Sequence, residues 1–234
     1  MTIVSSLSAI HDRIARAARR AGRSPDDVAL MAVTKTFAAA TIIEAYEAGQ
    51  RLFGENRVQE FAEKVSGISG LRDAQFHMIG HLQSNKVSKA AEIFHAVDSL
   101  DSVKLGERLN ASAEKLGKTL DVLIEINVGG EEAKSGIAPG SDVLENILVT
   151  APEWQNLRIR GLMTVPPFTE DPEVARPYFR ELRELRDRLA GLNLPSVSFD
   201  VLSMGMSHDF EVAIEEGSTC VRLGTAIFGT RARL

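Results

Sequence analysis

The chain has 234 residues, of which 44% are hydrophobic and 25% charged, and its formal net charge is −5. These proportions are ordinary for a folded globular protein, and the acidic balance argues against nucleic acid as a partner. No apolar run approaches the ~20 residues of a membrane span, no segment resembles a secretion signal, and the single Cys220 permits no internal disulfide, so we expect a cytoplasmic protein without membrane contacts.

Short apolar runs, typical of buried strands, alternate along the chain with longer amphipathic segments that are typical of helices. The first amphipathic segment covers residues 6–21. Eight apolar runs follow it, at residues 28–34, 51–54, 76–80, 93–97, 122–128, 159–165, 199–203 and 221–224. Helical patterns follow the first seven of these runs, at residues 38–48, 58–65, 86–92, 102–116, 141–149, 172–189 and 208–216.

This alternation is the pattern of a (β/α)8 barrel. A doubly wound open sheet is the alternative, but it normally uses about five or six strands, so the strand count favours the barrel. We interpret the helix at 6–21 as a cap over the amino-terminal mouth. Residues 1–234 show no repeat, linker or low-complexity segment, so we expect a single domain. A closed barrel needs no partner to complete its sheet, and we therefore expect a monomer.

Lys35 closes the first apolar run, where a charged residue is unusual. An unpaired buried ammonium is costly, so this lysine must be neutralised, paired or used. A lysine that is pushed toward its neutral form attacks carbonyl compounds and forms a Schiff base. The alternative is that its apolar stem lies on the strand end while its ammonium group reaches water.

The ends of the last two predicted strands carry small side chains, hydroxyls and unpaired backbone N–H groups. They are the segments Ser203-Met-Gly-Met-Ser207 and Gly224-Thr225-Ala226. Loops after the seventh and eighth strands are the usual phosphate site of such barrels, and glycines such as Gly205 and Gly224 permit a close backbone approach. The alternative is that these glycines serve tight turns and that Ser207 caps the next helix.

The first and eighth strands are neighbours in a closed barrel, so a phosphorylated aldehyde held in this cradle would reach Lys35. Pyridoxal phosphate is such a compound. Arg222, at the end of the eighth strand, is placed to face its pyridine nitrogen. Because arginine keeps its proton, the ring nitrogen would stay unprotonated, which suits storage or modest proton chemistry better than carbanion chemistry. The alternative for Arg222 is a salt bridge with Glu216.

Several longer segments resemble the signature of a known family. They are Ala32-Val-Thr-Lys35-Thr, Phe53-Gly-Glu-Asn-Arg57, Phe76-His-Met-Ile-Gly-His-Leu-Gln-Ser-Asn-Lys86, Lys134-Ser-Gly136, Gly161-Leu-Met-Thr164, Leu202-Ser-Met-Gly-Met-Ser207 and Val221-Arg-Leu-Gly-Thr-Ala-Ile-Phe-Gly229. Together they resemble the pyridoxal phosphate homeostasis proteins, the YggS/PROSC-type family, from about residue 28 to residue 229.

The resemblance implies a single-domain barrel like the amino-terminal domain of alanine racemases. It implies pyridoxal phosphate bound to Lys35 as a Schiff base, with Arg222 at the pyridine nitrogen and Asn56 near the ring. It places the phosphate on Ser207, Gly224 and Thr225. We expect Met204 to pack at the barrel mouth and to touch the cofactor.

The resemblance further implies a role in pyridoxal phosphate homeostasis and amino-acid balance, without established catalysis and with pyridoxal-phosphate-dependent apo-enzymes as partners. Many members carry a second lysine shortly after the Schiff-base lysine, where this chain has Thr36-Phe-Ala38. Lys134 is the candidate for a secondary attachment point.

Two other functions remain open at this stage. An amino-acid racemase would use the same cofactor, but it needs a second base, usually a tyrosine, and a further β-domain; this chain has only Tyr46 and Tyr178, both in helical segments. A Schiff-base aldolase would bind a sugar phosphate instead. His77 and His81 straddle a strand end, so we expect no metal site.

Overall fold

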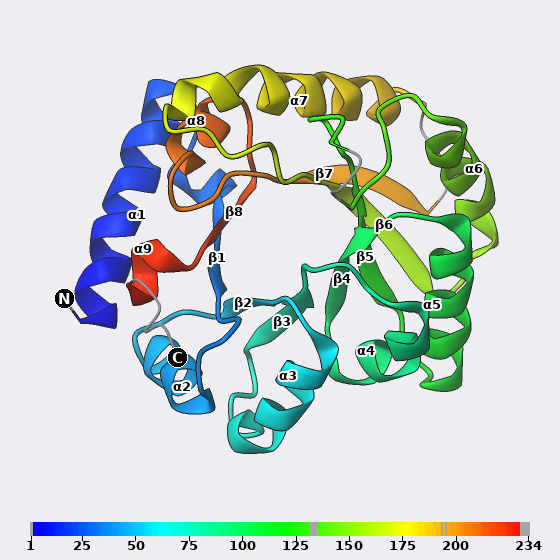
Figure 1. Ribbon diagram of the computed structural model, residues 1–234, viewed down its shortest axis with the longest axis horizontal. Coiled ribbons are helices and arrows are strands. Elements are labelled where there is room, and N and C mark those ends of the chain that lie inside the picture. The colour runs from blue at the N-terminus through cyan, green and yellow to red at the C-terminus, as the bar shows by residue number, and fades with distance from the viewer. Residues whose placement is uncertain (1, 132–134, 193, 195, 230–234) are drawn as a thin grey trace.

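The computed structural model describes residues 2–131, 135–192, 194 and 196–229. Eight parallel strands form a closed barrel in which every strand pairs with the next one along the chain and the eighth pairs with the first (Figure 1). The strands are β1 (Ala29–Val33), β2 (Leu52–Glu55), β3 (Gln75–Met78), β4 (Ala96–Leu100), β5 (Leu120–Glu125), β6 (Leu157–Met163), β7 (Val197–Ser203) and β8 (Cys220–Leu223). The barrel prediction is therefore confirmed.

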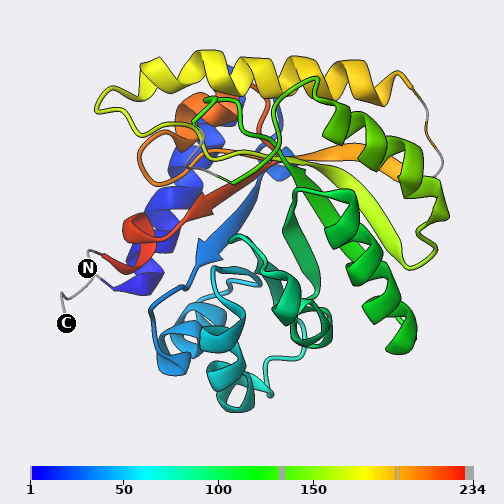
Figure 2. The ribbon, with the colours of Figure 1, turned by 45° about the vertical axis from the view of Figure 1, so that its right-hand side comes forward.

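Helices follow the strands and cover the outside of the barrel (Figure 2). They are α2 (Ala39–Glu47), α3 (Val58–Lys64), α4 (Val87–Ile93), α5 (Val103–Lys115), α6 (Asp142–Thr150), α7 (Arg176–Ala190), α8 (Phe210–Glu215) and the single turn α9 (Thr225–Phe228). Strands in such a barrel are covered on both faces, which explains why their sequences read as almost continuous apolar runs. No helix in the described part of the chain is long and apolar enough to cross a membrane.

The first helix, α1 (Ile3–Arg20), lies on the outside of the barrel, so its interpretation as a cap over the amino-terminal mouth is wrong. It packs mainly against α8 and α9 (Figures 1 and 2). Its apolar stripe, which includes Leu7, Ile10 and Ile14, is buried there. Because α9 is only one turn long, it leaves part of the wall unshielded, and α1 takes the place of a full eighth helix.

The fourth strand begins three residues later than predicted, because Ile93 ends α4. Its second half contains Asp98 and Ser99, which resemble residues beyond a strand but are both buried. Both have hydrogen-bond partners: Asp98 contacts His77, and the Ser99 hydroxyl donates to the carbonyl oxygen of Gly80. The strand therefore continues through these two polar residues, because neighbouring elements supply their hydrogen-bond partners.

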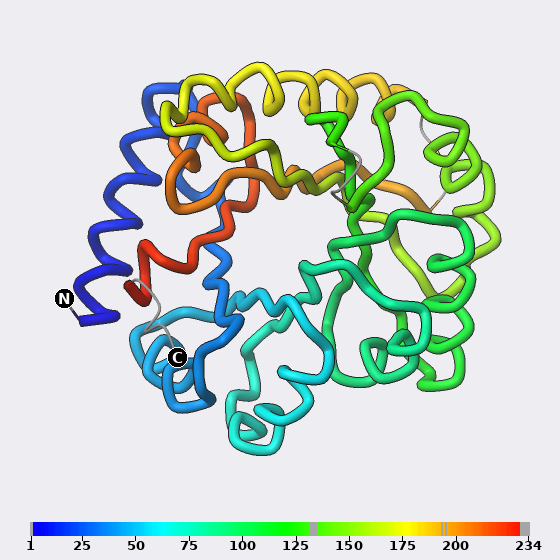
Figure 3. The backbone as a smooth tube through the Cα atoms, viewed as in Figure 1, coloured from blue at the N-terminus to red at the C-terminus, as the bar shows by residue number. Residues whose placement is uncertain are grey.

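The pairing of β1 with β8 places the two most important strand ends side by side. Met31 is opposite Arg222, and Ala32 is opposite Leu223. The chain runs once around the barrel before β8 returns to β1, as the tube in Figure 3 shows. Residues about 190 positions apart in the sequence thereby come together at one mouth.

Candidate functional site

A cleft of about 650 Å³ opens at the carboxyl ends of the strands. Six of the seven residues predicted to bind a cofactor line this cleft: Lys35, Asn56, Ser207, Arg222, Gly224 and Thr225. These residues come from the ends of β1, β2 and β8 and from the loop after β7. The convergence of strand ends, which the barrel predicted, brings them to one place.

The seventh residue, Met204, does not line the cleft. Its side chain is fully buried in the core, and its amide continues the strand pattern by donating to the carbonyl oxygen of Cys220. The chain then turns at Gly205, where φ is +94°, and the next residue, Met206, reaches the cleft. Lys134, the predicted secondary attachment point, lies outside the described residues.

Lys35 lies in the lining of the cleft and is partly buried. Thr34, before it, is fully buried, and Thr36, after it, has a φ of +70°. Left-handed backbone is uncommon for a residue other than glycine, so the chain leaves the strand through a strained turn at this point. Lys35 projects from a stretch of backbone that is held on both sides.

Ser207 reaches across to the residues that follow β8. Its Oγ accepts a hydrogen bond of 3.2 Å from the amide of Ala226 in the first turn of α9. It does not cap α8, whose N-cap residue is Asp209 and which has no side-chain cap hydrogen bond. The Asp209 carboxylate accepts from the amide of Met206, before the helix, at 2.6 Å. An oxygen atom thus already occupies a position in front of the amino end of α9.

The two glycines of the predicted phosphate cradle differ in their surroundings. A Cβ atom on Gly205 would lie 2.6 Å from Cβ of Ala213, so this glycine is required by a turn packed against α8. A Cβ atom on Gly224 would be 3.4 Å from the carbonyl oxygen of Val33, a tolerable contact at the edge of the cleft. Of the two, only Gly224 lines the cleft.

Arg222 is buried beneath the cleft, with 4% of its surface exposed. Its Nη1 donates to Oγ of Ser203 and its Nη2 donates to the carbonyl oxygen of Thr164, both at 2.7 Å. The alternative salt bridge to Glu216 does not form, because that carboxylate pairs with Arg176, Arg180 and Arg183. Burial lowers the pKa of Arg222, but a guanidinium group keeps its proton in proteins.

Glu125 is a cleft residue that the sequence reasoning missed. It ends β5 and is 5% exposed. Its Oε1 accepts from the hydroxyl of Ser135 at 3.0 Å, whereas its buried Oε2 has no hydrogen-bond partner. Burial raises the pKa of Glu125. The sequence does mark this residue, because a glutamate within an otherwise apolar run is unusual.

Close packing against Glu125 also explains the glycine of the segment Lys134-Ser-Gly136. Gly136 has a φ of +99°, and a Cβ atom there would lie 3.1 Å from Cγ of Glu125. The loop between β5 and α6 therefore closes against Glu125 only with a small, left-handed residue at this position.

An adjoining groove of about 730 Å³ contains other residues of the signature segments. Arg57 and Lys86 line this groove, while Asn56 and His81 line both the groove and the cleft. The two signature segments after β2 and β3 thus meet beside the cleft, and only part of each faces it.

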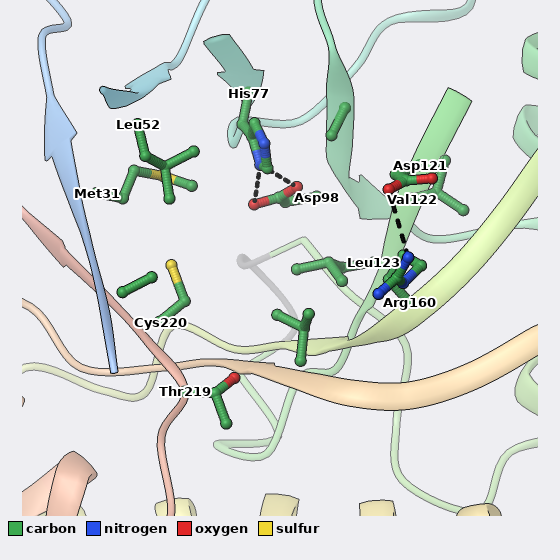
Figure 4. Close-up of a pocket in the computed structure, with 13 residues that line it drawn as sticks. Met31, Leu52, His77, Asp98, Asp121, Val122, Leu123, Arg160, Thr219 and Cys220 are labelled. Atoms are coloured by element: carbon green, nitrogen blue, oxygen red, sulfur yellow. Dashed lines mark hydrogen bonds and ion pairs between the residues drawn. The ribbon is translucent and has the colours of Figure 1, made fainter. Parts of the chain in front are cut away.

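A second cavity, of about 210 Å³, lies toward the opposite end of the barrel, near the starts of several strands (Figure 4). Nδ1 of His77 lies 3.1 Å from a carboxylate oxygen of Asp98 in its wall. Burial raises the pKa of the neighbouring Cys220 thiol to about 12, so this cysteine stays protonated as a core residue. None of the described residues predicted to bind the cofactor lines this cavity.

In the part of the chain that the structure describes, no three histidine, cysteine, aspartate or glutamate side chains are grouped so that they can hold a metal ion. Nδ1 of His81 lies 3.3 Å from Asp101 and that of His77 contacts Asp98, so each imidazole has its own carboxylate partner.

Residues 5–232 match the family described as alanine racemase, N-terminal domain. Among solved structures, the alanine racemase of Streptomyces coelicolor A3(2) shares this fold, with a TM-score of 0.72 and 20% identity over 97% of this chain and 59% of that one. PipY of Synechococcus elongatus PCC7942, solved with PLP bound, is more similar: the TM-score is 0.84 and the identity 36%, over 97% of this chain and 100% of that one.

Two relatives that match almost the whole of this chain share one name. The pyridoxal phosphate homeostasis protein of Aquifex aeolicus is 46% identical over 231 residues, which cover 99% of both chains. That of Escherichia coli K12 is 42% identical over 234 residues, which cover 98% of this chain and 97% of the relative. By fold, by length and by this degree of identity, the chain belongs to the pyridoxal phosphate homeostasis protein family.

Proposed function

We propose that this protein binds pyridoxal 5'-phosphate in the cleft at the carboxyl mouth, as a Schiff base on Lys35, and takes part in cellular pyridoxal phosphate homeostasis and amino-acid balance. The observation that carries the proposal is that one cleft brings together the amine-bearing Lys35, the buried Arg222 and two hydroxyl residues, Ser207 and Thr225. The PLP-bound structure of PipY supports the choice of ligand.

The residues of the cleft fit the groups of this cofactor. Lys35 supplies the amine for its aldehyde. Ser207, Gly224 and Thr225 supply hydroxyl and backbone N–H groups for its phosphate. The amide of Ala226 already donates a hydrogen bond to an oxygen atom there, Oγ of Ser207. When bound, the cofactor supplies an electron-accepting ring.

Arg222 limits what that ring is used for. The guanidinium is held rigidly by Ser203 and Thr164, and it offers only hydrogen-bond donors. A ring nitrogen that faces it accepts a hydrogen bond and stays unprotonated. This arrangement favours holding the cofactor over demanding carbanion chemistry.

The two tyrosines are also not placed for racemase chemistry. The hydroxyl of Tyr46 donates to Asp73, and Tyr178 packs against the core from α7; neither lines the cleft. A racemase needs a second base opposite the lysine. An amino-acid racemase is therefore the less favoured function, and racemisation assays with D- and L-amino acids test it. Rapid turnover would replace the proposal with that alternative.

Borohydride reduction followed by peptide mapping tests the attachment site. We expect the phosphopyridoxyl group on Lys35 and no aldimine absorbance in Lys35→Ala. Lys89→Ala, which removes an exposed lysine on α4, is the matched control and should retain the band. Label confined to Lys134 or to another lysine would overturn the assignment. A protein that takes up no pyridoxal phosphate would point to the aldolase alternative instead.

The proposal includes a cytoplasmic place of work and delivery of the cofactor to pyridoxal-phosphate-dependent apo-enzymes. Loaded protein should activate such an apo-enzyme faster than the cofactor's spontaneous release allows. Equal rates with and without contact between the two proteins, separated by a dialysis membrane, would argue against direct delivery.

A further inference from the structure

Both residues that flank Lys35 contact the same group of charged side chains, which we call the Lys64 cluster: Glu55 at the end of β2, and Glu60 and Lys64 on α3. Nζ of Lys64 lies 3.0 Å from Oε1 of Glu55 and 2.8 Å from Oε1 of Glu60. The side chain of Glu55 is fully buried, that of Lys64 is 10% exposed and that of Glu60 is 26% exposed. This shielding makes the cluster more rigid than a surface ion pair.

The cluster holds the residue before Lys35 through two contacts. Lys64 Nζ donates to the carbonyl oxygen of Thr34 at 3.2 Å. The Thr34 hydroxyl donates to Oε1 of Glu55 at 2.8 Å. Thr34 is therefore fixed through both its backbone and its side chain, on the side of β1 that faces α3.

The cluster holds the residue after Lys35 through Glu60. The amide of Thr36 donates to Oε1 of Glu60, the same oxygen that accepts from Lys64. Thr36 has a φ of +70°, and the only other described non-glycine residue with positive φ is Ser196. Backbone of this kind persists only where its surroundings hold it. Here the Glu60 carboxylate holds the Thr36 amide, and a backbone hydrogen bond from Phe37 to Thr34 closes the turn.

We propose that Glu55, Glu60 and Lys64 are positioning residues that direct the amine of Lys35 into the cleft. They act through the peptide groups on either side of Lys35, with Thr36 in a conformation that it would otherwise leave. This inference rests on the proposed role of Lys35 as the attachment site. It also explains why the signature segment Phe53-Gly-Glu-Asn-Arg57 includes a fully buried glutamate.

Two sets of variants separate positioning from the effect of charge. Glu60→Ala removes the acceptor for the Thr36 amide and one negative charge. Lys64→Met combined with Glu55→Gln removes the contact of Lys64 with the Thr34 carbonyl oxygen without changing the net charge. It keeps an acceptor for the Thr34 hydroxyl and avoids leaving a buried carboxylate without its partner. Glu60→Gln keeps an acceptor for Thr36, and Lys89→Met, which breaks only the exposed pair with Glu92, is the control.

The first readout needs no cofactor. Reductive methylation of the cofactor-free protein, quantified peptide by peptide, gives the rate at which Lys35 reacts relative to the exposed Lys89 and Lys104 at each pH. The second readout is the rate at which absorbance develops after pyridoxal phosphate is added. Circular dichroism and thermal melting confirm that each variant is folded.

We expect pyridoxal phosphate to react about tenfold more slowly with both Glu60→Ala and the Lys64→Met/Glu55→Gln variant, because misdirecting a reacting group by about 1 Å has effects of this size or larger. Glu60→Gln should recover most of the rate. In a Thr36→Gly background, Glu60→Ala should lose less, because glycine adopts positive φ without help.

Two outcomes would overturn the proposal. One is that only Glu60→Ala slows the reaction with pyridoxal phosphate and that the same variant also changes the pH dependence of Lys35 methylation. The cluster would then act on Lys35 through its charge and not by positioning it. The other is that folded variants react as fast as the wild type. If peptide mapping places the cofactor on another lysine, the proposed function fails, while the methylation rates still report whether the cluster orients Lys35.

Discussion

Nη1 of Arg222 donates a 2.7 Å hydrogen bond to Oγ of Ser203, a neutral acceptor in the interior of the barrel. Nη2 of the same guanidinium donates to the carbonyl oxygen of Thr164, which is neutral as well. No carboxylate is among these two hydrogen-bond partners, although the nearby carboxylates of Glu125 and Asp209 favour the charged form of Arg222. The hydrogen-bond partners of Arg222 therefore affect how strongly its guanidinium attracts a ligand in the cleft.

Arg222→Ala should weaken cofactor retention and shift the absorbance of the bound cofactor. It also leaves the oxygens of Ser203 and Thr164 without a donor, and we expect it to lower the free energy of unfolding by about 1–3 kcal/mol. Ser203→Ala is the matched variant, because it removes one acceptor and keeps the guanidinium. It should lower stability by about 1–3 kcal/mol, because Nη1 of a buried cation loses its acceptor, and it should shift the spectrum less than Arg222→Ala does. An unaltered spectrum and affinity in Arg222→Ala would refute a contact with the ring.

Glu125→Gln should make the protein less sensitive to rising pH. Burial raises the pKa of Glu125 in the folded state. Above the ordinary pKa of about 4.3, the unfolded chain loses this proton while the folded chain keeps it, so stability falls as the pH rises toward the raised value. The glutamine variant has no such proton, and its advantage over the wild type should grow across this window.

Urea denaturation of the cofactor-free protein at several pH values measures this difference. The exposed Glu107→Gln on α5 is the control and should follow the wild type. A gap between Glu125→Gln and the wild type that stays constant with pH would mean that Glu125 is not held protonated by its site.

The barrel was predictable from the sequence because strands buried on both faces and amphipathic helices leave distinct patterns. The place of α1 was not, because it depends on α9 being too short to cover its part of the barrel. The continuation of β4 through Asp98 and Ser99 was hidden because the partners of these two residues lie on other segments of the chain. Local pattern carries no information about either relationship.

The site shows the same division. The meeting of Lys35, Arg222 and Ser207 followed from the rule that strand ends converge at one mouth. The exchange of Met204 for Met206 depends on the turn at Gly205, whose direction is set by packing against Ala213. The contact of Thr36 with Glu60 joins the loop after β1 to α3, and that of Glu125 with Ser135 joins the end of β5 to the loop that follows it. Only the folded chain reveals these contacts.

Asp98→Asn should destabilise the protein more at acidic than at alkaline pH. Burial opposes a charge on His77, but the neighbouring Asp98 carboxylate outweighs this and raises the pKa of His77. A raised histidine pKa contributes stability that is fully present below the ordinary value of about 6.5 and is lost as the pH rises through the raised value. The asparagine variant lacks this contribution.

The melting temperatures of Asp98→Asn and the wild type should therefore converge as the pH rises from 5 to 9. The control variant His11→Gln, at an exposed position, should parallel the wild type. Curves for Asp98→Asn that run parallel to the wild type would contradict the assignment.

Gly106→Ala should destabilise the protein, although alanine normally favours a helix interior over glycine by about 1 kcal/mol. Gly106 lies in α5, and a Cβ atom there would be 2.2 Å from Cη2 of Trp154, whose side chain is buried. A tryptophan ring is too stiff to give way without a shift of the surrounding elements. We expect the free energy of unfolding to fall by about 1–3 kcal/mol, the usual effect of overpacking a core. Because Trp154 is the only tryptophan, its fluorescence reports the displacement directly.

Gly70→Ala is the control, since a Cβ atom there meets nothing within 4 Å, and its stability should stay within about 0.5 kcal/mol of the wild type. A Gly106→Ala protein as stable as the wild type, with unchanged fluorescence, would show that α5 and the Trp154 segment are not packed together as closely as the structure has them.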